Sequence, residues 1–444
     1  MTYDEMNRLF DELWPIARSI TGPGIASSLG ILQKHIPLIV HEVPTGEPVF
    51  DWIVPPEWKL NIATLHTEDG EQILSTEDSN LHVLNFSEPF SGLVDFEELD
   101  SHLHSDPSLP EATPYVTSYY VRRWGLCLPH TQRTKLKRDI RYRVNIDTEI
   151  FDGHLRYGEA VLPGQTDETV LLSSYLCHPS MANNELSGPL ALVALYHKLL
   201  AQTDRHYTYR FLIIPETIGS ITFLARSSRA ELDKIKAGIV LTCLGGASPA
   251  ISFKHSRRHW LGQVSQIDAL AEAFCRYDAH NFTARPFTPI NGSDERQFCS
   301  PAINLPVIQA ARTVYGGYDQ YHTSFDTKDM MRISSVMDSV EKIRLVLKAF
   351  DLNRSPLTSE IGGGEPMLGR RNLYPTMNSS QIRNMSADGF SDHRSQLNLM
   401  LEVLSLIDGT RKILEIVEFL GKPIGAVVPI VETLMEDGMV RISG

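Results

Sequence analysis

The sequence predicts an α/β protein whose main domain is a mostly parallel sheet with helices on both faces, with a small β-rich domain inserted into it and a separate unit at the C-terminal end. Three observations lead to this prediction. From about residue 155 onward, apolar runs of strand length alternate with amphipathic helical patterns, which is typical of βαβ units. Before that point, short β-like runs are separated by Pro, Gly and Asp. A stretch rich in Gly, Pro, Ser and Asn precedes the last segment of the chain.

The length and composition are those of a globular protein that folds without a partner. The chain has 444 residues, 42% of them hydrophobic and 21% charged, which is enough to bury a large core in two or three domains. Its formal net charge of -13 would repel a phosphate backbone, so no nucleic-acid partner is expected. No apolar run approaches the roughly 20 residues that a membrane span needs, and the N-terminal residues are polar and acidic, unlike a signal peptide. We therefore expect a cytoplasmic protein without a membrane partner.

The cysteines indicate reduced thiols. Their number is odd, and no two of them form a Cys-x-x-Cys pair. A disulfide framework uses cysteines in pairs, and a thiolate zinc site needs closely spaced cysteines. The residues are Cys127, Cys177, Cys243, Cys275 and Cys299.

The N-terminal third of the chain contains two kinds of pattern. Apolar residues at helical spacing predict two helices before the chain changes to short β-like runs. We assign residues 1–39 and 148–355 to the α/β domain and residues 40–147 to the inserted domain. The aromatic phrases around Trp52 and Tyr115 are interpreted as core and interface packing, and contacts in a homo-oligomer are the second interpretation.

The α/β domain is predicted from its order of elements. Strand-like runs cover residues 169–175, 209–214 and 238–244, and helical patterns cover residues 187–200 and the sequence near Ile221. Loops at the carboxyl ends of parallel strands are where binding sites normally lie. Every candidate site residue below falls in such a loop.

The C-terminal part is predicted to be a linker followed by a small helical domain. Residues 356–390 are rich in Gly, Pro and polar residues, which is typical of a linker. In residues 391–444, short helical patterns precede a β-like run, and this order resembles a winged helix. This part contains five Lys or Arg against eight Asp or Glu, so it lacks the positive charge that DNA binding needs. We expect it to contact protein. Its helical patterns cover residues 397–407, 413–420 and 424–437.

The clearest chemical signal is a histidine at the end of an apolar strand. The run of residues 171–178 ends at His178, and a polar loop then leads to a helix whose start carries Asn184 and Glu185. A neutral imidazole at a strand end suits zinc, and Asn184 or Glu185 offers an oxygen ligand. A loop histidine taken alone is more often hydrogen-bonded than metal-bound, so His178 needs partners elsewhere in the chain.

A carboxylate follows the next predicted strand. Glu216 comes directly after Ile213, Ile214 and Pro215, which places it at the same edge of the sheet as His178. A carboxylate beside an activated water is the general base that metal-assisted hydrolysis needs. The alternative is that Glu216 serves the amino terminus of the following helix.

Two later polar segments offer further candidates. His322 lies among polar residues before a helix, where it is either a second metal ligand or only the neighbour of a helix cap. Asp294 and Arg296 occupy a charged stretch that enters an apolar run, and they either bind the ends of a substrate or pair with one another. We predict that Asp294, Arg296 and Tyr321, together with Asn184, bind the substrate.

Four short motifs occur in order over residues 171–329: a His loop with Asn-x-x-Ser-Gly, then Pro-Glu-x-x-Gly-Ser, Ser-Asp, and Tyr-His-Thr-x-x-Asp-Thr. This order resembles the co-catalytic zinc aminopeptidases of the bacterial leucyl aminopeptidase type. The resemblance implies a zinc-exopeptidase-like fold in which His178 and His322 each hold a zinc ion and Glu216 is the general base.

A closer resemblance covers nearly the whole chain. The phrases at residues 51–58, 115–120, 177–189 and 293–298 are similar to those of a bacterial group of aminopeptidase-like proteins. That group has a small inserted domain near the amino terminus and ends in a winged helix. The resemblance therefore implies the same domain order here.

The sequence departs from the aminopeptidase pattern at four positions. Asn184 stands where the bridging Asp is expected, Thr217 where a second Glu would be a ligand, and Ser180 where an Asp would orient the first histidine. The strand that ends near Cys243 also lacks its expected Asp ligand. Two zinc ions bring four positive charges and need several carboxylates close by, so two ions are not expected. We predict one zinc ion, held by His178, Glu185 and His322.

Three functions follow from these observations. The main hypothesis is a zinc-dependent, aminopeptidase-like hydrolase that cuts a peptide or a small amide, with Glu216 as the base or, alternatively, as a ligand. The first alternative is a catalytically altered or non-catalytic member of the fold that binds a metal or a ligand. The second is a regulator that binds DNA through its C-terminal domain. An amino-terminal residue of a peptide, an acylated amino sugar and a small natural-product amide all fit the main hypothesis.

Overall fold

The computed structural model describes residues 1–373 and 393–443. Two compact units make up the chain. Unit 1 contains Met1–Ser265 and Arg285–Glu341, and unit 2 contains Gln266–Ala284 and Lys342–Gly444. Each unit is described by itself.

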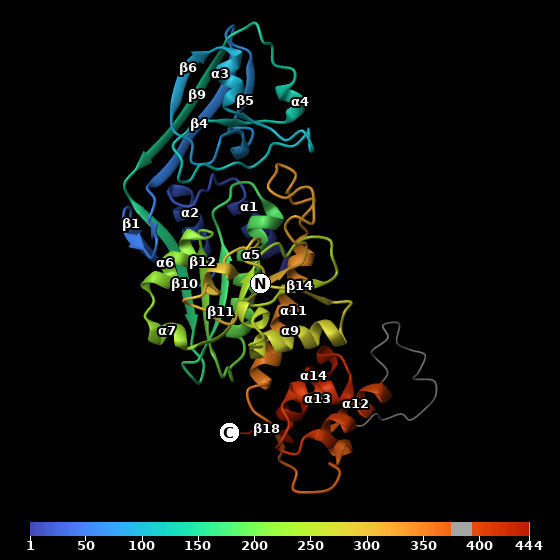
Figure 1. The fold of residues 1–444 in the computed structure, drawn as a ribbon. Coiled ribbons are helices and arrows are strands. Elements are labelled where there is room, and N and C mark those ends of the chain that lie inside the picture. Colours follow the sequence, from blue (N-terminus) through green and yellow to red (C-terminus); the bar gives the residue numbers. More distant parts are fainter. Residues whose placement is uncertain (374–392, 444) are drawn as a thin grey trace. The chain divides into compact units, whose positions relative to one another are not determined.

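Unit 1 is built on a large mixed sheet, which confirms the predicted α/β class (Figure 1). Its central strands β12, β11, β13 and β16 are parallel. Strand β10 pairs antiparallel with β12 on one side and β14 pairs antiparallel with β16 on the other, while the edge strand β1 pairs antiparallel with β10 and so runs in the direction of the central strands. The strands lie in the order β1 (Ile39–Pro44), β10 (His154–Leu162), β12 (Thr208–Ile214), β11 (Thr169–Tyr175), β13 (Ile235–Leu241), β16 (Val307–Ala311) and β14 (Ile251–Lys254).

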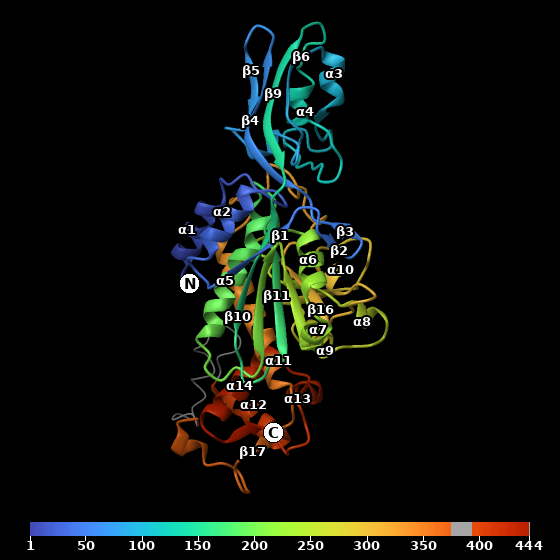
Figure 2. The same cartoon turned by 90° about the vertical axis from the view of Figure 1, so that its left-hand side faces the viewer.

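The central strands are buried on both faces because helices cover both sides of the sheet. Every residue of β11 and β16 is buried, as expected for parallel strands between two helical layers. Figure 2 shows α1, α2 and α5 on one face and α6 and α7 on the other. The helices of unit 1 are α1 (Tyr3–Leu13), α2 (Pro23–Leu32), α5 (Ser187–Leu200), α6 (Ile218–Arg226), α7 (Arg229–Asp233), α8 (Arg257–Trp260) and α10 (Glu295–Phe298).

A second, four-stranded antiparallel sheet lies at one end of unit 1 (Figures 1 and 2). Its strands follow the order β5 (Gln72–Ser75), β4 (Glu57–Thr67), β9 (Tyr142–Phe151) and β6 (Phe90–Val94). This sheet lies almost entirely within residues 40–147, the range predicted to be a β-rich inserted domain. The boundaries at residues 40 and 147 stay a prediction. Shorter elements in this region are β2 (Pro48–Val49), β3 (Trp52–Ile53), η1 (Asn80–His82), α3 (Phe96–Ser101), β7 (Leu103–His104), β8 (Leu126–Cys127) and α4 (His130–Arg133).

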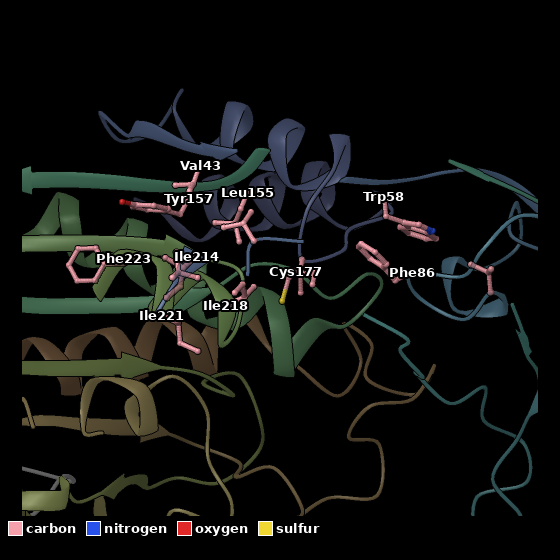
Figure 3. Close-up of a cluster of buried hydrophobic side chains, with 14 of the residues drawn as sticks. Val43, Trp58, Phe86, Leu155, Tyr157, Cys177, Ile214, Ile218, Ile221 and Phe223 are labelled. Atoms are coloured by element: carbon pink, nitrogen blue, oxygen red, sulfur yellow. The ribbon is translucent and has the colours of Figure 1, made fainter. Parts of the chain in front are cut away.

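The cores of the two sheets form one continuous cluster of buried apolar side chains. Figure 3 shows Trp58 and Phe86 at one end of this cluster and Phe223 at the other, with Cys177 between them. Burial of large apolar side chains is the main stabilising term in folding. The shared core therefore joins the second sheet to the edge of the large sheet near residue 177.

Unit 2 contains the C-terminal helices in the predicted order. Helix α13 ends at Gly421, whose left-handed φ of 61° is typical of a glycine that terminates a helix. The elements are α9 (Gln266–Tyr277), β15 (Phe282–Arg285), the C-terminal part of α11 (Ile333–Leu352), β17 (Leu357–Ser359), η3 (Leu368–Arg371), α12 (His393–Leu406), α13 (Ile413–Leu420), α14 (Ile424–Glu436) and β18 (Val440–Ile442). Strands β17 and β18 pair antiparallel. Residues 374–390 of the predicted linker and residues 391 and 392 of the predicted C-terminal domain lie outside the described residues.

Two predictions made from composition can be compared with the structure. All five cysteines are free, as predicted. In the described ranges, no helix combines the length and the apolar character that crossing a membrane requires.

Candidate active site

Three of the predicted side chains meet at the carboxyl edge of the large sheet. His178 follows β11, Glu216 follows β12, and His322 lies in the loop after β16. The imidazole rings of His178 and His322 have their centroids 5.3 Å apart, and Nε2 of His178 lies 3.6 Å from Oε2 of Glu216. Residues that are 144 positions apart in the chain are thus brought to one place.

The loops around these side chains hold strained backbone. Ser180, Thr217, Cys243 and His322 all have a positive φ, between 49° and 63°. Residues other than glycine adopt this region at a cost of about 1–3 kcal/mol, and such residues cluster at functional sites. Three of them, Ser180, Thr217 and Cys243, occupy positions where the sequence departs from the aminopeptidase pattern.

Glu185 contacts the backbone and the side chain of the loop that carries His178. It lies in the π-helical turn η2 (Ala182–Leu186), is fully buried, and accepts hydrogen bonds from the backbone N–H groups of Cys177 and His178. Its Oε2 lies 2.7 Å from Nδ1 of His178. Since Nε2 of the same ring points to Glu216, one ion cannot bind Nε2 and the Glu185 carboxylate together. These contacts suit a carboxylate that orients His178, which is the usual task of a carboxylate next to a metal-binding histidine, and the ligand role of Glu185 stays a prediction.

Cys177, His178 and Glu185 offer ligand atoms that lie close together. Burial raises the pKa of the Cys177 thiol to about 11 in the absence of a metal. Its Sγ accepts a hydrogen bond from the backbone N–H of Glu216. Cys177 thus links the loops that carry His178 and Glu216.

His322 presents a nitrogen that suits a metal. Its Nε2 is buried and has no hydrogen-bond partner in the described part of the chain. Burial, with a further contribution from His178, lowers the pKa of His322 to about 3, so the ring is neutral. Tyr321 stacks on it with ring centroids 3.9 Å apart. A neutral imidazole with an unpartnered buried nitrogen is the form that binds zinc, so the donors present fit such an ion.

Glu216 is placed to act on a group bound between the two histidines. Its Oε1 accepts a hydrogen bond from Oγ of Ser293 at 2.7 Å, which leaves Oε2 to face His178. The side chain is 28% exposed and can therefore meet a substrate. Burial raises the pKa of Glu216, which moves this carboxylate toward the range in which a general base works well.

The predicted substrate-binding residues divide into two groups. Asn184 and Asp294 are buried and occupied, because Asn184 Oδ1 accepts from the Tyr175 hydroxyl, and Asp294 Oδ1 accepts from the Thr217 N–H. These hydrogen bonds hold the loops that carry Asn184 and Asp294 in place, while Oδ2 of Asp294 has no hydrogen-bond partner in the described part of the chain, and the substrate contacts of both residues stay a prediction. Arg296 and Tyr321 are only half-buried, and their substrate contacts stay a prediction.

Neutral groups occupy the region where a second metal would need carboxylates. The Tyr175 hydroxyl lies 3.0 Å from Asn184 Oδ1 and 2.6 Å from Thr242 Oγ1. Cys243 lies beside them, and burial raises the pKa of its thiol to about 12. Neither the amide, the hydroxyls nor the thiol carries the negative charge that a second zinc ion needs. The number of zinc ions stays a prediction.

Asp294 leads to a prediction on pH dependence. Burial, followed by the charge of Glu216, raises the pKa of Asp294 to about 8, against about 4 in an unfolded chain. The folded state therefore binds this proton more tightly, and the free energy of unfolding falls as the pH rises from about 4 to about 8. The Asp294→Asn variant lacks this titrating group, so its free energy of unfolding should not fall in this way. The difference in free energy of unfolding, variant minus wild type, should therefore rise by on the order of 1 kcal/mol for each pH unit in that window.

Urea unfolding of the zinc-free protein at several pH values between 5 and 8 measures this effect. Asp147→Asn, at an exposed position on β9, is the matched control and should show no such trend. A constant difference between Asp294→Asn and the wild type across the window would contradict the prediction.

A cavity of about 800 Å³ lies beside the loop that carries His322. Polar side chains from residues 318–332 form much of its lining, and Phe325 and Met330 supply apolar surface. This volume is within the range of small-molecule sites. The polar side chains are Tyr318, Gln320, Thr327, Asp329 and Arg332.

Two family models together match most of the chain. The model described as a domain of unknown function, DUF4910, matches residues 7–353. The chain belongs to this family. A winged helix-turn-helix model matches residues 356–442, which confirms the predicted winged helix.

One similar protein extends this result over nearly the full length. A Clostridium acetobutylicum protein is 39% identical over 415 residues, which cover 94% of this chain and 91% of that protein. It is named as a proposed polysaccharide biosynthesis protein with an aminopeptidase-like domain.

Solved structures confirm the predicted resemblance to zinc aminopeptidases at the level of the fold. A crystal structure of a proposed peptidase from Clostridium acetobutylicum is 35% identical and has a TM-score of 0.83, covering 99% of this chain and 96% of its own. A zinc aminopeptidase from Bacillus subtilis has a TM-score of 0.56 at 12% identity, covering 78% of this chain and 93% of its own. A peptidase precursor from Shewanella amazonensis has a TM-score of 0.51 at 16% identity, covering 76% and 90%. The DUF4910 chain thus has the fold of peptidase-type hydrolases.

The structure adds two residues to the site that sequence reasoning missed. Arg18 is fully buried, and its Nε donates to the carbonyl oxygen of His178 at 3.0 Å. The ring of Tyr115 lies 5.0 Å from that of His178 and 5.4 Å from that of His322. Arg18 lies far from the motifs, and the phrase that begins at Tyr115 was interpreted as core and interface packing. An arginine between two helical patterns was the only available signal for Arg18.

Proposed function

We propose that this protein is a zinc-dependent hydrolase of peptides or small amides, of the aminopeptidase type. Nε2 of His178 and Nε2 of His322 hold one zinc ion, and Glu216 is the general base. The observation that carries the proposal is the convergence of these three side chains, with a buried nitrogen of His322 that has no hydrogen-bond partner among the described residues. Peptidase-type relatives support it.

The proposed reaction needs a nucleophile, a base and a proton donor for the leaving amine. Zinc, when bound, polarises the scissile carbonyl and lowers the pKa of water. Oε2 of Glu216 takes a proton from the attacking water as the new C–O bond forms. The same oxygen then gives that proton to the nitrogen as the C–N bond breaks, which leaves a carboxylic acid and an amine. Ser293 keeps Glu216 in place through its hydrogen bond to Oε1.

Removal of either imidazole tests the metal site directly. We expect His178→Ala and His322→Ala to lose bound zinc, and their zinc affinity to fall by more than the roughly 10–100-fold that the loss of an outer-shell partner costs. Zinc content after dialysis and competition with a chelator measure this. His280→Ala, at an exposed position, is the control and should bind zinc like the wild type. The proposal would be overturned by a wild-type protein that takes up no zinc. It would also be overturned by a variant with both His178→Ala and His322→Ala that binds zinc as tightly as the wild type.

A second candidate function is supported by the neutral residues beside the site. Asn184, Thr217 and Cys243 stand where ligands of a two-metal enzyme are expected, so the site has lost part of that machinery. A member of the fold that binds a ligand without cutting it would show this pattern. It would retain zinc and bind amides, yet release no amine during prolonged incubation. Release of amine from an amide substrate therefore distinguishes the two functions.

A further inference from the structure

A segment of the second-sheet region reaches the loop that carries His322. The backbone N–H of Tyr115 donates to the carbonyl oxygen of His322 at 2.8 Å, and Pro114 forms an antiparallel bridge with Thr323. One residue further out, the N–H of Ser324 donates to the carbonyl of Thr113 at 2.9 Å, and the N–H of Thr113 donates to Oγ of Ser324 at 3.0 Å. These contacts fix the position of Tyr115 relative to His322.

The ring of Tyr115 faces both imidazoles. Its centroid lies 5.0 Å from the centroid of His178 and 5.4 Å from that of His322, and the two imidazoles are 5.3 Å apart. The three rings therefore form a nearly equilateral triangle. A group bound between the two histidines lies next to the phenol ring.

The hydroxyl of Tyr115 anchors this ring. It shares a hydrogen bond of 2.5 Å with the hydroxyl of Tyr119, whose ring packs edge-on against Phe86. Burial raises the pKa of both tyrosines, so both hydroxyls stay protonated. The backbone bridge at one end and the hydroxyl pair at the other hold the ring as a fixed wall.

We propose that Tyr115 is a specificity-determining residue, which limits the size of the group attached to the scissile carbonyl. The proposal rests on the proposed function. With the carbonyl held near His178, His322 and Glu216, the adjoining group of the substrate meets the face or edge of the phenol ring. Small acyl groups fit beside the phenol ring of Tyr115, whereas bulky acyl groups fit only when that ring is removed.

The turnover of a series of substrates of increasing size tests whether Tyr115 limits the size of the acyl group. The substrates are the 4-nitroanilides of glycine, alanine, leucine and phenylalanine. We expect Tyr115→Ala to raise the ratio of kcat/KM for phenylalanine over alanine by about 10-fold or more, the effect of a pocket enlarged by several methylene equivalents. Tyr115→Phe keeps the ring and should keep the wild-type ratio. Tyr120→Ala, at an exposed position on the same segment, is the matched control.

Tyr115→Leu replaces Tyr115→Ala should the latter fail to fold, and it predicts a smaller rise in the same direction. An unchanged ratio in both variants would overturn the proposal. A fall of kcat for all substrates with an unchanged ratio would also overturn it, because a merely structural role of Tyr115 gives that result.

A second measurement tests the proposed role of Tyr115 separately from the proposed function. In protein labelled with 3-fluorotyrosine, the fluorine resonances that vanish in Tyr115→Phe and Tyr120→Phe identify the two residues. Added zinc should shift the Tyr115 resonance and leave that of Tyr120 in place. Zinc uptake without a Tyr115 shift would overturn only the proposal on Tyr115. No zinc uptake by the wild type would overturn the proposed function and this proposal together.

Discussion

Glu216→Gln is expected to lower kcat for amide hydrolysis by about 10²–10⁴-fold while zinc stays bound. The glutamine amide has nearly the same shape, and its carbonyl oxygen can still accept the hydrogen bond from Ser293. It cannot take a proton from water at neutral pH. The variant thus removes the base and keeps the geometry. Steady-state kinetics with an amide substrate and zinc analysis on the same preparation check both halves of this prediction.

Ser293→Ala is the matched control for this variant. It keeps the carboxylate and removes only the hydroxyl that holds Oε1, so we expect a smaller loss of kcat than with Glu216→Gln. A fully active Glu216→Gln protein would discard Glu216 as the base. Loss of zinc together with activity would instead make Glu216 a third ligand, since its Oε2 lies 3.6 Å from the ring nitrogen of His178.

The fold could be predicted from the sequence because each element carries its own local signal. Strand β11 contains the apolar run Val170-Leu171-Leu172 without any charged residue, and it is buried on both faces in the structure. The helices α13 and α14 have apolar spacing with a glycine at the end of the first, and the winged helix that they predict is confirmed. The antiparallel direction of β10 could not be predicted in this way, because strand direction depends on contacts between distant segments.

The site could be predicted only in part, for the same reason. His178 and Glu216 each follow an apolar run, and parallel strands bring such positions to one edge, whereas His322 lies among polar residues in the loop after β16 and was marked by its motif. The role of Glu185 depended on which nitrogen of His178 its carboxylate meets, and the π-helical turn η2 that sets this geometry leaves no clear mark in the sequence. Asp294 has the charge of a substrate-binding residue, yet tertiary packing buries it completely. Substrate, zinc stoichiometry and oligomeric state stay predictions.

Glu185→Gln is expected to weaken zinc binding by about 10–100-fold with a modest loss of stability. The carboxylate accepts a hydrogen bond from the N–H at Nδ1 of His178, which keeps the proton on Nδ1 and leaves Nε2 free for a metal. In the variant, the amide can keep its oxygen toward the backbone N–H groups of Cys177 and His178 only by turning its NH₂ group toward Nδ1. Nδ1 must then be an acceptor, so the proton moves to Nε2, the nitrogen that should bind zinc.

Glu185→Ala removes the acceptor as well and should be far less stable. It leaves two backbone N–H groups without a partner in the interior, each at a cost of about 1–3 kcal/mol. It also takes away a negative charge whose field supports the buried Arg18 guanidinium, and Arg18 itself holds the carbonyl of His178. Glu149→Ala removes an exposed carboxylate that pairs with Lys59 at the surface, and it serves as the control. It should lower the free energy of unfolding by less than about 1 kcal/mol.

The two Glu185 variants separate orientation from folding. Urea unfolding of the zinc-free proteins measures stability, and chelator competition measures zinc affinity. An orienting carboxylate predicts that Glu185→Gln loses zinc affinity out of proportion to its stability, because only the tautomer of His178 has changed. Equal zinc affinity in Glu185→Gln and the wild type would show that the proton on His178 does not depend on Glu185. A stable Glu185→Ala protein would show that the N–H groups of Cys177 and His178 find another acceptor, such as water, and the burial of Glu185 would then have no structural consequence.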